Sequence, residues 1–513
     1  MMAFAPCAAV LLTNASAASF GTRGFFEDIS FRFQANPAAL RYGVSIVDVN
    51  GDGVFEAFVC GYGGANGVYM WQRGHLVDIA GSMGLAAPGR QAIGVASCDV
   101  DGDGAEEIYV LNTDSYSGDK VYSDHLFKRT PQRQYEDLMV RPVNRASRSS
   151  FAGRSVACVD RRGDGVYGVA AASYSRPLLL YELADKASGA VVDVAREAGF
   201  VGVTGGRGIT GGPLAPGKDY TTSAGMDVFM DNERGPSFFF QNDGHGRFTE
   251  VAGKLGISDE RSNGRGVALL DANADGKVDI AVGNWMGQHR LWLAPAAGSG
   301  EKPGLYVDAA PPAMARPSPI RTVVVADFDN DGYQEIFFNN ICSCPHNMPS
   351  MCSEPNRLFR TRDGVTWEPV SIGSAAEQFG RGTGAAAYDA DGDGLLELLI
   401  SHGENRAEPL SLHRVADLGA AKRNHYLRVL PRTQGGAPAR GALVTLRELG
   451  GRTQVRVIDP GSGYLCQQEP VAHFGLGAAT AVESVTITWP GGERQVLRAI
   501  EVDRLHEAPF PRA

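Results

Sequence analysis

The 513-residue sequence has no apolar run of about 18 residues, the length that a membrane-spanning helix requires. Positive charge is not in excess either, because the formal net charge is −10, which argues against nucleic acid as a partner. Gly-x-Ser-x-Gly, His-Glu-x-x-His and Walker motifs are missing, and His473 and Ser462 have no triad-like constellation around them. The sequence therefore predicts no membrane span, no nucleic-acid partner and no catalytic residues.

Cysteine is also scarce. Eight cysteines in a chain of this length are too few for a disulfide scaffold, and none has the paired Cys-x-x-Cys spacing of a zinc site. Cys342, Cys344 and Cys352 are close enough in sequence to form one local bridge, or else they are free thiols in an insertion. The sequence leaves these two alternatives open.

Acidic loops of one fixed pattern are abundant. Five segments carry Asp, Asn or Glu at positions 1, 3, 5 and 9 and Gly at position 6. Oxygen ligands at alternating positions around a tight turn suit Ca²⁺, and position 12 is apolar in all five, which excludes the EF-hand. We expect about five Ca²⁺ sites of a structural kind. The candidate ligands are Asp48, Asn50, Asp52, Glu56, Asp99, Asp101, Asp103, Glu107, Asp271, Asn273, Asp275, Asp279, Asp327, Asp329, Asp331, Glu335, Asp389, Asp391, Asp393 and Glu397.

The loops also define a repeat. Two degenerate copies begin at Asp160 and Asp219, and with them the spacing between successive loops is 51 to 62 residues. Each unit has apolar, strand-like runs before and after its loop and then a second pair of strands. Seven such units predict an all-β fold, a seven-bladed β-propeller over residues 19–420. The segment 24–29 resembles an outer strand without a preceding unit, so we expect it to complete the last blade.

Strand-like runs of a different pattern follow the repeats, and they predict a small C-terminal β domain over residues 421–506 with a tail at 507–513. At the other end, residues 1–18 combine an apolar run with a small-residue cleavage pattern, which predicts a secretory signal peptide. The chain's single Asn-x-Ser/Thr sequon, at Asn14, lies inside that segment.

An arginine precedes or begins the first strand of every unit, at the end of the strand opposite its acidic loop. In a propeller these ends surround the central channel. The arginines either form a cationic site for an acidic protein loop or a sulfated glycan, or tie neighbouring blades together. They are Arg41, Arg90, Arg154, Arg207, Arg265, Arg321 and Arg381.

Several segments carry a family resemblance, among them 151–160, 327–331, 461–466 and 469–477. With the repeats, they make the chain similar to the ASPIC/UnbV family, in which integrin-α-like FG-GAP repeats precede an ASPIC/UnbV module. The resemblance implies a secreted matrix or neural cell-surface protein that acts by binding other proteins. One departure is that this sequence lacks the cysteines of the EGF-like module that follows in vertebrate members.

The sequence thus predicts a secreted, extracellular calcium-binding protein that serves as a protein–protein interaction module of the ligand or antagonist type, and not an enzyme. Its expected partners are extracellular proteins or acidic glycans. The alternative is a propeller enzyme that acts on glycans or peptides in the central channel. A third possibility is a purely structural matrix component.

Overall fold

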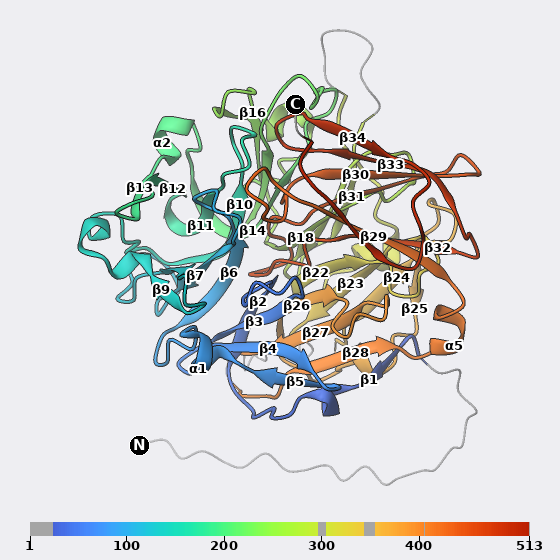
Figure 1. The fold of residues 1–513 in the computed structure, drawn as a ribbon, viewed down its shortest axis with the longest axis horizontal. Helices are drawn as coiled ribbons and strands as arrows, with labels where there is room; N and C mark the ends of the chain where they lie inside the picture. The colour runs from blue at the N-terminus through green and yellow to red at the C-terminus, as the bar shows by residue number, and fades with distance from the viewer. Residues whose placement is uncertain (1–23, 296–303, 343–353, 405, 512–513) are drawn as a thin grey trace.

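The computed structural model describes residues 24–295, 304–342, 354–404 and 406–511. The expected signal peptide, Cys344 and Cys352 lie outside these residues. The described chain is dominated by antiparallel strands, and strands β1 to β28 pair into seven sets of four. Five sets are separate sheets and two are joined into one eight-stranded sheet. The predicted all-β propeller is confirmed (Figure 1).

Each set begins with a buried first strand and ends with a more exposed fourth strand. The sets are β2 (Arg41–Val47), β3 (Glu56–Gly61), β4 (Gly67–Gln72) and β5 (His75–Asp78); β6 (Ala92–Cys98), β7 (Glu107–Asn112), β8 (His125–Arg129) and β9 (Tyr135–Asp137); β10 (Gly153–Val159), β11 (Gly168–Pro177), β12 (Leu179–Asp185) and β13 (Ala190–Asp193); β14 (Val203–Gly212), β15 (Asp227–Asn232), β16 (Phe238–Asn242) and β17 (Phe248–Glu250); β18 (Gly264–Leu270), β19 (Asp279–Asn284), β20 (Arg290–Leu293) and β21 (Val307–Asp308); β22 (Ile320–Ala326), β23 (Glu335–Asn340), β24 (Arg357–Arg360) and β25 (Glu368–Val370); and β26 (Gly382–Tyr388), β27 (Glu397–His402), β28 (Ser411–Val415) and β1 (Phe26–Asp28). Within the described residues, five one-turn α-helices connect elements: α1 (Ala80–Met83), α2 (Ala195–Ala198), α3 (Ala252–Leu255), α4 (Pro312–Ala315) and α5 (Leu418–Ala421).

The first strands form a closed ring. Each contacts the first strand of the next set, from β2 through β6, β10, β14, β18 and β22 to β26, and β26 contacts β2 again. The N-terminal strand β1 pairs with β28, so the last set contains the first strand of the chain. The expectation for segment 24–29 is confirmed, and this pairing closes the ring non-covalently.

Close packing of the first strands explains why several of them contain a glycine near their start. A Cβ atom on Gly94 would lie 2.2 Å from the carbonyl oxygen of Arg154 on the next first strand. A Cβ atom on Gly266 would lie 2.5 Å from the backbone nitrogen of Val323, again on the neighbouring set. Because no side chain fits at these distances, glycine is required where adjacent strands converge on the channel.

The C-terminal strands form two further sheets that lie across one face of the propeller, shown in red in Figure 1. One sheet has the order β32-β29-β35 and the other β31-β30-β33-β34. These strands enclose a separate apolar core that includes Leu427, Val444, Phe474 and Trp489. The strands are β29 (His425–Pro431), β30 (Leu443–Glu448), β31 (Thr453–Val457), β32 (Ala472–Gly477), β33 (Val482–Thr488), β34 (Arg494–Leu497) and β35 (Leu505–Ala508).

A long connection between β31 and β32, residues 459–469, enters the propeller channel. We call it the channel loop. It pairs with first strands from several sets, so the channel is filled by a segment of the C-terminal domain. Its backbone hydrogen bonds to the first strands include Gln467 N to Val44 O at 2.8 Å, Val95 N to Leu465 O at 3.2 Å, and Gly463 N to Val267 O at 2.6 Å.

Gln467 is the most highly bonded side chain of the channel loop. Its Oε1 accepts hydrogen bonds from Ser45 Oγ at 2.7 Å and from Ser97 N at 2.8 Å. Its Nε2 donates to Ser97 O at 3.0 Å and to Pro460 O at 3.2 Å. The side chain is fully buried, so it satisfies first-strand groups that have no access to water.

A disulfide joins Cys98, at the end of β6, to Cys158 in β10. It links two neighbouring first strands close to the channel loop. Cys342, by contrast, is a buried free thiol, and its two possible local partners are outside the described residues. The bridge in the structure therefore joins two repeats, whereas the bridge considered from sequence was a local one.

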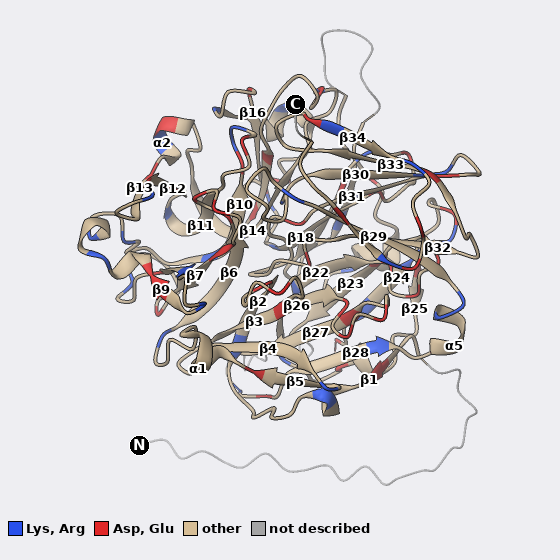
Figure 2. Cartoon of the chain, in the orientation of Figure 1, with Lys and Arg blue, Asp and Glu red and all other residues tan. Residues whose placement is uncertain are grey.

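Figure 2 shows acidic and basic residues interspersed along the ribbon, with neither sign confined to one side of the molecule. None of the helices in the described residues is both long and apolar enough to cross a membrane.

Replacing Gln467 by Ala tests the role of the channel loop. The change leaves the backbone of Ser97 without two buried partners, so we expect the free energy of unfolding to fall by about 2–4 kcal/mol. Gln434→Ala, at an exposed position of the same domain, is the matched control and should change it by less than about 0.5 kcal/mol. Urea unfolding of both variants gives the comparison, and equal stability would contradict a tightly bound channel loop.

Candidate metal centres

The five acidic loops share one geometry. In each, one oxygen of the Asp at position 1 accepts the N–H of the Gly at position 6, at 2.8–3.0 Å. One oxygen of the acid at position 9, the first residue of the second strand, accepts the N–H of position 2 at 2.8–3.0 Å. These bonds fix two carboxylates of each loop across one turn.

Glycine at position 6 has a conformational cause. Its φ lies between 80° and 95° in all five loops, in the left-handed region that glycine adopts without strain. The glycines are Gly53, Gly104, Gly276, Gly332 and Gly394.

The structure brings positions 1, 3 and 9 together in three of the loops. Ligand atoms of three such groups lie within 4.8 Å of one another: Asp99, Asp101 and Glu107; Asp327, Asp329 and Glu335; and Asp389, Asp391 and Glu397. The position-5 aspartates accept the backbone N–H two residues later at 2.9–3.0 Å, which braces the turn. They are Asp52, Asp103, Asp275, Asp331 and Asp393.

Unpaired buried oxygens indicate which loops fit a cation. Oδ1 of Asp327, Oε1 of Glu335, Oδ1 of Asp389 and Oδ1 of Asn50 are buried without a hydrogen-bond partner in the described chain. A carboxylate oxygen left in this state is costly unless a cation or a proton compensates it. Burial accordingly raises the pKa of Glu335 well above its usual range, and the pKa of Asp389 to about 6. The loops that begin at Asp48, Asp327 and Asp389 therefore fit a hard cation such as Ca²⁺.

The Asp99 loop already has a cation from the chain itself. Nζ of Lys128, on the third strand β8, lies 2.5 Å from Asp101 Oδ2, 2.7 Å from Asp103 Oδ2 and 3.1 Å from Glu107 Oε1. Burial opposes the charge of Lys128, but the carboxylates around it hold its pKa above the ordinary value. The carboxylate oxygens of this loop are absent from the unpaired buried atoms of the described residues. An ammonium group thus offsets part of the negative charge of a loop where Ca²⁺ was expected.

In the other four intact loops, the same place on the third strand carries an arginine in two sets and an apolar side chain in two. In β24 it is Arg360, which pairs with Glu368, and in β28 it is Arg414, which pairs with Glu27. β4 has Met70 there, and β20 has Leu293, as the strand registers show.

In the Asp271 loop both oxygens of Asp279 accept backbone N–H groups, from Ala272 at 2.8 Å and Ala294 at 2.7 Å. This loop lacks unpaired buried oxygens in the described chain, and it fits Ca²⁺ less closely than the loops with them.

The two degenerate loops also use ionic side chains of the chain. In the loop at Asp160, Arg161 and Arg162 both pair with Glu182 on the third strand β12. In the loop at Asp219, the position-9 residue Asp227 pairs with Lys218 at 3.3 Å. Three consecutive repeats, those of the Asp99, Asp160 and Asp219 loops, thus have ion pairs within the protein at or beside the loop.

The C-terminal domain contacts the acidic loops directly. Arg428 Nη1 lies 2.6 Å from Asp389 Oδ2 and also pairs with Glu469 of the channel loop. The backbone N–H of Gly475 donates to Asp327 Oδ2 at 3.0 Å. The face of the propeller that carries the loops is thus the face on which the second domain docks.

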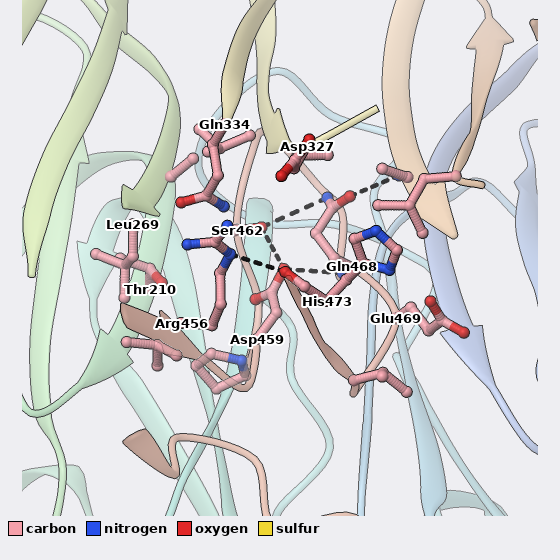
Figure 3. A pocket seen from close by; sticks show the side chains of 18 residues that line it. Thr210, Leu269, Asp327, Gln334, Arg456, Asp459, Ser462, Gln468, Glu469 and His473 are labelled. Atoms are coloured by element: carbon pink, nitrogen blue, oxygen red, sulfur yellow. Dashed lines mark hydrogen bonds between the residues drawn. The ribbon is translucent and has the colours of Figure 1, made fainter. Parts of the chain in front are cut away.

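A buried polar cavity of about 90 Å³ lies between these loops and the channel loop (Figure 3). Ser462 and His473 both line it, but Ser462 Oγ bonds Asp459 Oδ2 at 2.5 Å and His473 Nε2 bonds Asn330 Oδ1 at 2.6 Å. Burial lowers the pKa of His473 well below its usual value, so the ring is neutral. The two side chains are held by separate partners and do not form a catalytic pair.

The seven arginines separate into two groups. Arg41, Arg90 and Arg381 make contacts that brace the blades: Arg41 Nη1 bonds Ala65 O at 3.2 Å, Arg90 lies over the Tyr122 ring at 5.3 Å, and Arg381 Nη1 bonds Cys342 O at 2.7 Å. The other four line one cavity at the channel mouth, namely Arg154, Arg207, Arg265 and Arg321.

Comparison with known proteins identifies families and relatives that the chain matches. The FG-GAP-like repeat family matches residues 38–110 and 271–338, and the ASPIC and UnbV family matches residues 432–509. Cartilage acidic protein 1 of Homo sapiens is 46% identical over 508 residues, which cover 94% of this chain and 74% of the human protein. The Xenopus tropicalis protein of that name is 47% identical over 486 residues, covering 90% and 72%.

The chain belongs to the cartilage acidic protein 1 family. The resemblance found in the sequence is confirmed. Among solved structures, the BP39L lectin from Burkholderia pseudomallei is similar with a TM-score of 0.46 and 14% identity, over 74% of this chain and 97% of the lectin.

Lys128→Met tests the assignment of the Asp99 loop. Removing the ammonium group leaves Asp101 and Glu107 without their cation, so we expect the variant to bind one more Ca²⁺ than the unmodified chain. Ions are counted by calorimetric titration, and Lys254→Met, an exposed lysine on α3, is the control. An unchanged ion count with intact folding would show that Lys128 does not take the place of Ca²⁺.

Proposed function

We propose that this chain is a secreted, extracellular calcium-binding protein that acts by binding other proteins, as a matrix or neural cell-surface ligand or antagonist. Membership of the cartilage acidic protein 1 family and the FG-GAP-like repeats support this proposal. The ions occupy the loops that begin at Asp48, Asp271, Asp327 and Asp389, while Lys128 replaces the ion of the Asp99 loop.

The unpaired buried oxygens of the loops carry the calcium part of the proposal. Asp327 Oδ1 and Glu335 Oε1 face the same small volume with Asp329, and three carboxylates there repel one another unless a cation lies between them. Ca²⁺ takes six to eight oxygen ligands and accepts such an irregular set. The ion ties the turn between the first and second strands of a blade, so its role is structural.

Secretion is supported by the bridge between Cys98 and Cys158. Structural disulfides persist in oxidising compartments and are rare in the cytosol. An extracellular location also supplies the Ca²⁺ concentrations, near a millimolar in order of magnitude, at which modules of moderate affinity are filled.

The filled channel weighs against the alternative of a propeller enzyme. Such an enzyme needs an open channel in which a glycan or peptide meets catalytic groups. Here the channel loop occupies that volume and hydrogen-bonds to the first strands through Gln467 and its neighbours. We therefore propose binding rather than catalysis, with partners that are extracellular proteins.

Calcium removal is the direct test. Ca²⁺ binds the folded chain and not the unfolded one, so melting temperature in excess EDTA should rise by several degrees or more on titration with Ca²⁺. Calorimetry should count about four ions, one for each of the four loops assigned above. If the melting temperature did not change with Ca²⁺, these loops would be excluded as metal centres. Mg²⁺ at the same concentration is the control.

The effect of Ca²⁺ should also depend on pH. Burial raises the pKa of Glu56 to about 8 and that of Asp279 to about 7 in the metal-free chain, above the values near 4 of the unfolded chain. A raised carboxyl pKa means that the metal-free fold loses stability as pH rises from about 4 toward about 8. Since Ca²⁺ requires deprotonated ligands, the increase in melting temperature that it causes should grow over this range. A pH-independent increase would refute the protonation of these ligands.

A further inference from the structure

A second cavity opens at the end of the channel opposite the acidic loops. It has a volume of about 310 Å³, and we call it the arginine pocket. Its walls come from the starts of the first strands and the loops beside them, and they include Arg154, Arg207, Arg265 and Arg321. Tyr464, from the channel loop, also lines it. The pocket therefore exists only when both domains are assembled.

Positive charge exceeds negative charge in the pocket. Glu233 pairs with Arg207 and, at 3.2 Å, with Arg265, while Glu404 pairs with Arg321. Arg154 has no carboxylate partner in the part of the chain that the structure describes. Its guanidinium donates to two backbone carbonyls, Gly153 O at 2.7 Å and Tyr116 O at 3.0 Å. The remaining acid, Asp114, lines the rim and is exposed.

The arginines keep unused hydrogen-bonding capacity although they are buried. Arg207 is 2% exposed, Arg265 4% and Arg154 6%. The Nε atoms of Arg207 and Arg265 are buried and have no hydrogen-bond partner among the described residues. An unpaired buried donor on a charged group is costly, so these groups point to an oxygen ligand.

Aromatic rings hold the guanidinium groups in place. Arg207 lies over the Tyr174 ring at 4.8 Å from its centroid, and Arg321 over the Trp285 ring at 4.4 Å. Such stacking fixes the planes of the guanidinium forks before any ligand arrives. Fixed forks favour a planar ligand that accepts two parallel hydrogen bonds.

The field of the pocket changes the titration of its own side chains. Burial opposes ionisation of Tyr464, but the charges of Arg207, Arg154 and other arginines lower its pKa to about 8. Burial, together with repulsion from Arg207 and Arg321, lowers the pKa of Arg265 to about 9. A negative group in the pocket relieves both effects.

We propose that the arginine pocket binds a carboxylate group from an acidic side chain of a partner protein. A planar carboxylate matches the guanidinium forks, and the cavity has room for a single acidic side chain and its stem. A sulfated glycan needs an exposed basic surface along which it can lie, whereas Arg154, Arg207 and Arg265 are deeply buried. This contact rests on the proposed function of the chain as a protein that binds other proteins, but it does not depend on which loops hold Ca²⁺.

The test uses the full chain in the presence of Ca²⁺ and an acetylated, amidated tetraglutamate peptide as probe, with tetraglutamine as its neutral control. Arg154→Gln removes a guanidinium that has no carboxylate partner, so the change leaves no acid unpaired. Arg265→Gln leaves Glu233 with Arg207. Arg90→Gln is the matched control, because Arg90 belongs to the same series of arginines but does not line the pocket. Calcium-dependent melting confirms that each variant is folded.

We expect saturable binding of tetraglutamate, no binding of tetraglutamine, and affinity about tenfold weaker for Arg154→Gln and Arg265→Gln but unchanged for Arg90→Gln. The bound carboxylate offsets the arginine charge, so it should raise the pKa of Tyr464 and reduce phenolate absorbance near pH 8. Tyr464→Phe should abolish this signal and keep binding.

Absence of binding by a folded, calcium-loaded chain would overturn the proposal while leaving the calcium assignment intact. Equal affinity of all three arginine variants would also overturn it, because the peptide would then bind elsewhere. Binding of a heparin hexasaccharide that is lost in Arg154→Gln, without binding of tetraglutamate, would assign the pocket to a sulfated ligand and contradict the carboxylate.

Discussion

The insertion of the channel loop into the propeller is the interaction on which the rest of the structure depends. Seven first strands converge so closely that glycine is required between some of them, and their polar groups face a channel without water access. Gln467 supplies both a donor and an acceptor to Ser97, and Gly463 pairs with Val267. Because a buried unpaired amide is costly, the propeller and the C-terminal domain are two parts of one folded unit.

Repulsion among the carboxylates of the acidic loops is the second constraint, and the structure allows this negative charge to be offset in two ways. Three consecutive repeats use side chains of the protein, with Lys128, Arg161 and Lys218 pairing with loop or third-strand acids. In the other four repeats the protein's own cations offset the loop charge only in part, as where Lys277 pairs with Asp275 and Lys422 with Asp393. For those four loops, an ion from solution is the proposed counter-charge. The proposal therefore divides the ring into three consecutive repeats with counter-charges from the protein and four that hold Ca²⁺.

The structural features that could be predicted from the sequence are those that depend on the local spacing of residues. Asp327, Gly332 and Glu335 lie within nine residues, so their loop and its two strands follow from the order of residues alone. Lys128 could have been found only by placing it on the third strand, 21 residues after Glu107. Cys98 and Cys158 are adjacent because neighbouring first strands meet, which no cysteine spacing shows. The channel loop gave one signal, a stretch of more than ten residues without a strand pattern inside a small β domain, and loops of that length are usually functional.

The channel loop also connects the two ends of the channel. Glu469 shares Arg428 with Asp389 of an acidic loop, and Tyr464, five residues earlier, lines the arginine pocket. The proposed Ca²⁺ sites lie at the face where the second domain docks, and the proposed acidic ligand would contact the same docked segment from the opposite side. If both proposed ligands prefer the assembled form, each stabilises the arrangement that the other requires. The two proposals together predict that the chain binds its acidic partner more strongly when Ca²⁺ is present.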